Sequence, residues 1–69
     1  MVNTSELRAI IKDSGYKFEY LANQLEITRY SLRNKVNNIT EFKATEIMKL
    51  SEILNLDPMQ TDAIFLARG

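Results

Sequence analysis

Residues 18–37 read FEYLANQLEITRYSLRNKVN, and this stretch decides which fold the chain is expected to adopt. Apolar residues recur at three- and four-residue steps in its first half, which predicts a short helix over residues 18–25. Thr28 is a favourable N-cap residue, and Leu32 and Val36 then lie four residues apart on one face of a second helix. The stretch therefore predicts two short helices with a very tight connection between them.

The same kind of pattern extends to both sides of this pair. Apolar residues at helical spacing, together with cap residues such as the Asp57-Pro58 dipeptide, predict further helices over residues 4–14, 44–54 and 58–67. No strand is expected. Because 69 residues suffice for one domain only, the sequence predicts a single all-α domain spanning residues 1–69.

The composition argues against several classes of function. The chain has no cysteine and no histidine, which removes disulfides, the usual zinc ligands and the commonest general base. Carboxylate-based catalysis remains, but so short a helical chain has little room for a closed pocket, so neither an enzyme nor a cofactor is expected. No apolar run approaches the roughly 20 residues that a membrane span needs, and there is no signal-peptide pattern. We therefore expect a cytoplasmic protein without a membrane partner.

Charge is unevenly distributed along a chain whose nine basic and nine acidic residues balance. Residues 27–43 contain four basic residues against Glu41 alone, a balance of +3, whereas residues 44–69 have a balance of −2. A solvated helix face is the ordinary explanation for charge on a single helix. The difference in net charge between these two segments instead favours a positive surface beside the second of the two helices predicted in residues 18–37.

Two short helices with a small residue, Ala22, where they cross have the form of a helix-turn-helix unit. The stretch NKVNNITEFKATEI at residues 34–47 adds a second recognisable segment. The matching residues elsewhere are Leu7, Ile10, Ile11, Gly15, Leu21, Leu25, Ile27, Thr28, Leu32, Leu50, Leu54, Asn55, Leu56 and Asp57. On these residues the chain resembles phage repressor and Cro-type domains, particularly small Cro-like regulators of phages that infect Gram-positive bacteria. The resemblance implies a five-helix lambda-repressor-like DNA-binding domain with its helix-turn-helix at about residues 18–37.

The resemblance also implies which residues touch an operator of double-stranded DNA. The second helix of the unit would lie in the major groove, with its first residues facing base edges. The expected base-reading residues are Arg29, Tyr30, Arg33 and Asn34, since Arg suits guanine and Asn suits adenine. The expected phosphate contacts are Lys17, Thr28, Ser31, Lys35, Asn38 and Lys43.

Four positions in the sequence leave their interpretation open. Lys17 and Lys43 stand where helix N-caps are expected, although lysine has no acceptor. We expect both to approach phosphates, the alternative being solvated lysines with Glu46 covering the start of the helix at 44–54. Phe18 stands where the family commonly has a phosphate-binding Gln, and Glu26 where Gly is frequent, which predicts an altered or strained turn.

The aromatic residues Tyr16 and Tyr20 flank Phe18. They are expected to pack around it, although stacking on single-stranded bases is the alternative. The run Ile64-Phe65-Leu66 cannot all face one side of a helix. We expect a weak or DNA-assisted homodimer on a palindromic operator, the alternative being that the run closes the core. The expected dimer residues are Met59, Ile64, Phe65 and Leu66.

The expected function is therefore a sequence-specific DNA-binding transcriptional regulator, a Cro-like repressor. A second hypothesis keeps the helix-turn-helix fold but makes it a protein-interaction module, an antirepressor or corepressor that acts on a partner repressor. Zero net charge, Phe18 and the apolar run near the C-terminus fit this alternative.

Overall fold

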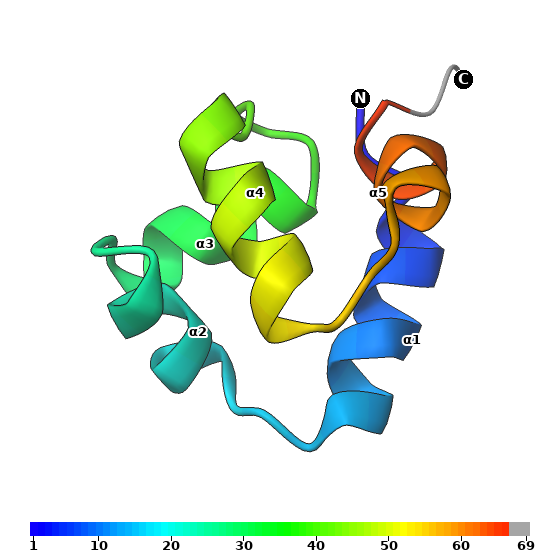
Figure 1. The fold of residues 1–69 in the computed structure, drawn as a ribbon. Helices are drawn as coiled ribbons and strands as arrows, with labels where there is room; N and C mark the ends of the chain where they lie inside the picture. The colour runs from blue at the N-terminus through cyan, green and yellow to red at the C-terminus, as the bar shows by residue number, and fades with distance from the viewer. Residues whose placement is uncertain (67–69) are drawn as a thin grey trace.

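The computed structural model describes residues 1–66, which form five helices and no strand within that range (Figure 1). The helices are α1 (Thr4–Ser14), α2 (Phe18–Gln24), α3 (Arg29–Val36), α4 (Ala44–Ile53) and α5 (Pro58–Phe65). Each predicted helix is present, and the all-α class is confirmed. The predicted last residue of the fifth helix, residue 67, lies outside the described range. No helix in residues 1–66 is both long and apolar enough to cross a membrane.

Local side-chain bonds explain where several helices begin and end. The Thr28 hydroxyl accepts the Ser31 amide hydrogen at 3.0 Å, so it satisfies a backbone donor that the first turn of α3 leaves free. The Asp57 carboxylate accepts the Gln60 amide hydrogen at 2.7 Å, and the Gln60 side chain accepts the Asp57 amide hydrogen in return. Gly15 ends α1 with a φ of 80°, a conformation that glycine adopts without strain.

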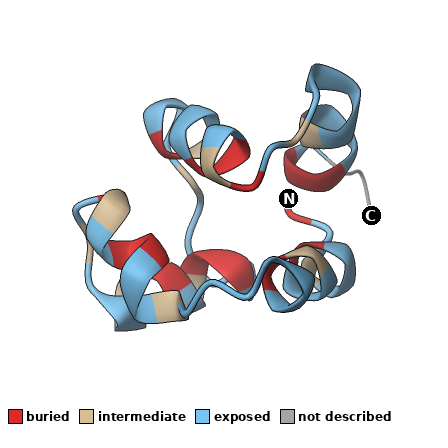
Figure 2. Cartoon of the chain, turned by 60° about the horizontal axis from the view of Figure 1, so that its bottom comes forward, coloured by how far each residue is buried: buried red, intermediate tan, exposed pale blue. Residues whose placement is uncertain are grey.

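All five helices contribute buried residues to one core, as the red segments in Figure 2 show. The first four helices each place one leucine there with no exposed surface: Leu7, Leu21, Leu32 and Leu50. Burying such a side chain stabilises the fold by about 1.5–3 kcal/mol. The core therefore fastens α2 and α3 to the other three helices.

The end of α5 closes this core beside the first residues of the chain. Ile64 has no exposed surface and Phe65 has 3%. The Phe65 ring packs edge-on against Phe42 at 5.2 Å between ring centroids, and the Ile64 carbonyl accepts the Asn3 amide hydrogen at 2.7 Å. The predicted role of Ile64 and Phe65 in a dimer interface is therefore wrong, because both side chains are inside the protomer. Leu66 stays 62% exposed.

Candidate nucleic-acid interface

The connection between α2 and α3 is short and held by the backbone. The Ile27 amide hydrogen reaches back to the Ala22 carbonyl at 3.0 Å, across the end of α2. Ala22 is 1% exposed, so no larger side chain fits there without displacing a neighbour. Glu26 has a φ of 58°, in the left-handed region that favours glycine. The strained form of the predicted turn is therefore confirmed.

The helix α3 has an inward and an outward face. Leu32 and Val36, four residues apart, have no exposed surface and hold the helix on the core. On the other side, Arg29 and Arg33 are exposed and also four apart, so they lie on neighbouring turns of one face. Tyr30 is 73% exposed. We call the predicted base-reading set the outward face of α3: Arg29, Tyr30, Arg33 and the half-buried Asn34.

The structure thus brings the four predicted base-reading residues together. Within residues 1–66 no carboxylate forms an ion pair with Arg29 or Arg33. The first turn of α3 contains no acidic residue. The guanidinium groups are therefore available to a ligand outside the protein. A planar guanidinium offers five donors in a fork that matches paired acceptors.

The margins of this face hold other predicted contacts. Thr28 is exposed while its hydroxyl caps α3, and Ser31 is half-buried. Lys17 and Lys43 are exposed at the N-cap positions of α2 and α4, and neither side chain caps its helix.

Lys35 lies on the inward side of α3, and its predicted phosphate contact is wrong. Its side chain is 9% exposed, and its ammonium donates to Glu46 Oε1 at 2.8 Å and to the Glu41 carbonyl at 3.2 Å. This is the one ion pair that residues 1–66 form. The three-residue spacing from Leu32 does not signal this burial by itself, because Arg29 has the same spacing on the other side of Leu32 and is exposed.

Glu46 links this ion pair to the start of α4. The same Oε1 atom accepts the Lys43 amide hydrogen at 2.8 Å, which confirms the alternative that Glu46 covers the helix start. We call Lys35, Glu41, Lys43 and Glu46 the α3–α4 junction. Burial alone would raise the pKa of the Glu46 carboxyl, but the bonds from Lys35 and from the Lys43 backbone, with the attraction of both lysines, hold that pKa below its ordinary 4.5.

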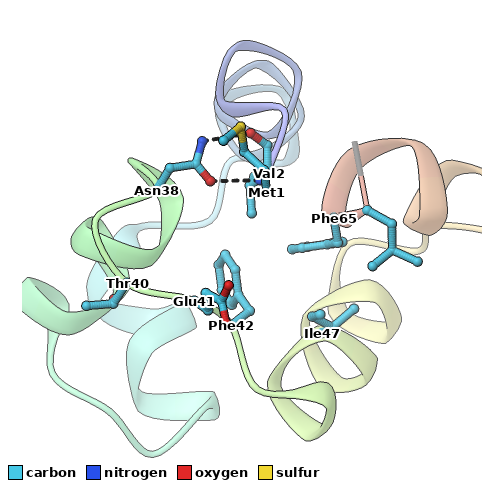
Figure 3. Close-up of a pocket in the computed structure, with 9 residues that line it drawn as sticks. Met1, Val2, Asn38, Thr40, Glu41, Phe42, Ile47 and Phe65 are labelled. Carbon is cyan, nitrogen blue, oxygen red and sulfur yellow. Dashed lines mark hydrogen bonds between the residues drawn. The ribbon is translucent and has the colours of Figure 1, made fainter. Parts of the chain in front are cut away.

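Asn38 is turned toward the beginning of the chain, and its predicted phosphate contact is also wrong. Its Oδ1 accepts the Val2 amide hydrogen at 2.7 Å, and its Nδ2 donates to the Val2 carbonyl at 2.9 Å (Figure 3). The same Nδ2 donates to the Thr4 hydroxyl at 3.2 Å. Both donors of the amide are engaged within the protein. The contact spans 36 residues of sequence, so no local pattern signals it.

The aromatic residues near α2 differ in burial and in packing partner. Phe18 is half-buried and packs against the core. Tyr16 and Tyr20 stack on each other with ring centroids 5.1 Å apart, and each keeps more than two-fifths of its surface exposed. Phe18 therefore packs against the core, and the two tyrosines form a stacked pair of their own on the surface.

Two open cavities of about 300 Å³ lie away from α2 and α3. One is between the beginning of the chain, the α3–α4 loop and α5, where Phe42 and Phe65 line it (Figure 3). The other lies between α4 and α5. Among residues 1–66, no three potential metal ligands stand close enough to hold a metal ion.

A scan against family models and searches of curated proteins and of solved structures find no match for this chain.

Proposed function

We propose that the chain is a sequence-specific, double-stranded DNA-binding transcriptional regulator, a cytoplasmic Cro-like repressor whose α2 and α3 form a helix-turn-helix. The observation that supports this most is the outward face of α3, where two arginines without an ion pair in residues 1–66 stand beside Tyr30 and Asn34. A structural role would not require such a set, because the inward residues Leu32, Lys35 and Val36 hold the helix on the rest of the domain.

The size and chemistry of α3 suit the major groove. An α-helix with its side chains is about 10–12 Å in diameter, and the groove is about 12 Å wide. Arg29 and Arg33 offer paired donors to guanine O6 and N7, and Asn34 offers a donor and an acceptor to adenine. Tyr30 offers its ring to a thymine methyl group or its hydroxyl to a phosphate.

Contacts with phosphates would come from the margins of the same face. Lys17 and Lys43 supply the positive side chains, and Thr28 and Ser31 supply hydroxyls. These contacts set the position of α3 without reading sequence. With Lys35 neutralised by Glu46, few cations remain for phosphates, so we expect modest affinity and a salt dependence whose slope reflects only those few contacts.

Pairing two chains would compensate for this modest affinity. A dimer on a palindromic operator places two recognition helices about 34 Å apart, one turn of DNA. Met59 and Leu66 are the two exposed members of the predicted interface, at 81% and 62% exposure. We propose a weak homodimer, formed with the operator, that uses these two side chains.

Selection of duplexes from a random pool, followed by titration at several salt concentrations, tests the function. We expect one enriched, approximately palindromic sequence, and a log affinity that falls linearly with log salt. Lys12→Ala on α1 is the matched control, because it removes an exposed cation outside the α2–α3 pair and should leave sequence preference unchanged. No binding to any duplex below about 100 μM at low salt contradicts the proposal.

A second candidate is an antirepressor or corepressor that docks on a partner repressor. The observation in its favour is the number of large apolar side chains that stay exposed outside α3: Met1, Ile39, Met48, Met59 and Leu66. A chain that binds no duplex but changes the operator affinity of a co-encoded repressor supports this candidate over the first.

A further inference from the structure

The α3–α4 junction joins the proposed base-reading helix to a proposed phosphate contact through one oxygen atom. Glu46 Oε1 accepts from the Lys35 ammonium on α3 and from the Lys43 backbone at the start of α4, each at 2.8 Å. The Lys43 side chain itself is exposed. In Figure 1 the chain leaves α3, turns back and enters α4, which crosses in front of α3.

The loop between the two helices is held at two separate places. Near its beginning, the Ile39 and Thr40 amide hydrogens donate to the Asn34 carbonyl at 2.8 and 3.3 Å. Near its end, the junction provides the bonds to the Glu41 carbonyl and the Lys43 amide. Without the junction, apolar packing of Phe42 and α4 would be left to set the position of Lys43 relative to α3.

A buried ion pair is a costly way to fill space. Removing two charges from water has a large free-energy cost for each ion, and an apolar pair of similar volume often stabilises a fold as well or better. A hydrogen-bonded pair differs from an apolar one in fixing direction as well as distance. The junction therefore has a geometric consequence that apolar packing would not give.

We propose that Lys35 and Glu46 are positioning residues that set the place of Lys43 relative to the outward face of α3. This inference rests on the proposed function. Lys35 contributes to DNA binding without touching DNA: it orients Glu46, which orients the Lys43 backbone. The distance between the base-reading helix α3 and the phosphate-contacting Lys43 is thereby fixed.

A double-mutant cycle on operator binding tests the inference. Lys43→Ala removes one phosphate contact and should reduce the slope of log affinity against log salt by about 1. Lys35→Met should reduce that slope by a similar amount, although its ammonium is buried, and the double variant should show no further reduction. A further reduction of about 1 in the double variant would mean that the two lysines act independently, and an unchanged slope in Lys35→Met would mean that the pair only stabilises the fold. Either result overturns the inference.

A second variant keeps the test usable if Lys35→Met folds poorly. Lys35→Met/Glu46→Gln leaves no unpaired buried charge. It keeps an acceptor near the Lys43 amide, but Lys35 no longer orients that acceptor, so the salt slope should fall by the same amount. Amide hydrogen exchange at Lys43 gives a readout without DNA and should be faster in both variants, whereas unchanged exchange contradicts the inference. If the wild-type chain binds no duplex, the proposed function falls and this role falls with it. If the wild type binds DNA but the slope reductions of Lys35→Met and Lys43→Ala add up in the double variant, only the positioning role of Lys35 and Glu46 is overturned.

Discussion

The outward face of α3 and the α3–α4 junction both hold positive side chains, and they differ in what that charge faces. Arg33 points away from the protein and has no ion pair within residues 1–66, whereas Lys35, two residues later, is buried against Glu46. One cation is available to a partner and the other is neutralised inside the fold. The difference teaches that a count of basic residues along a segment overstates the charge that its surface presents.

Replacing each of these two cations by methionine should separate their roles most strongly. Lys35→Met leaves the Glu46 carboxylate buried without its partner, and we expect it to lower the free energy of unfolding by about 3–5 kcal/mol. Arg33→Met should change that free energy by no more than about 0.5 kcal/mol, because the side chain is exposed. Urea unfolding of both variants measures the contrast. Equal loss of stability in the two variants would contradict the assignment of Lys35 to the interior.

Arg33 and Lys43 are both exposed cations, and we expect them to respond differently when DNA binding is measured. Arg33→Ala should cost roughly 1–3 kcal/mol of operator affinity and relax the preference at one base pair. Lys43→Ala should weaken all duplexes about equally. Titration against single-base operator variants distinguishes these outcomes. A preference that survives Arg33→Ala unchanged would show that Arg33 does not read a base.

Acid should weaken the α3–α4 junction, which contains the Glu46 carboxylate, whereas the outward face of α3 contains no carboxylate. The pKa of Glu46 is lower in the folded chain than its ordinary 4.5, so folding favours the charged form. The pair's contribution is complete above about pH 4.5 and is lost as the pH falls through the lowered pKa. Urea unfolding of wild type and Glu46→Gln between pH 7 and pH 3 should show the stability difference shrinking below pH 4.5. A constant difference across that range would contradict the lowered pKa.

How far the sequence predicts each region depends on the length of chain over which its contacts form. The five helices and the caps at Thr28 and Asp57 arise from bonds within one turn, so spacing and residue type suffice to predict them. The outward face of α3 follows from the same periodicity once Leu32 and Val36 are taken as its buried side.

The contacts that overturned predictions join residues far apart in the sequence. The partner of Lys35 lies eleven residues away and that of Asn38 lies 36 residues away, at Val2. The consecutive Ile64 and Phe65 are both buried because Asn3 and Phe42 pack around the end of α5. None of these pairings has a local signature: Arg29 and Lys35 both lie three residues from Leu32, but only Lys35 is buried.

The smallest expected effect on the free energy of unfolding concerns Glu26, in the turn that precedes α3 and its outward face. Glu26 and Asn55 have nearly the same backbone conformation, with φ of 58° and 57°. Left-handed backbone costs a residue such as Glu about 1–2 kcal/mol, whereas Asn tolerates it through its short polar side chain. Glycine relieves that strain but adds about 0.5–1 kcal/mol of unfolded-state entropy to be lost on folding. Glu26→Gly should therefore raise the free energy of unfolding by about 0.5–1 kcal/mol in urea, and Asn55→Gly should leave it unchanged or slightly lower it. A loss of stability in Glu26→Gly would mean that contacts of the Glu26 side chain stabilise the turn by more than its left-handed backbone costs.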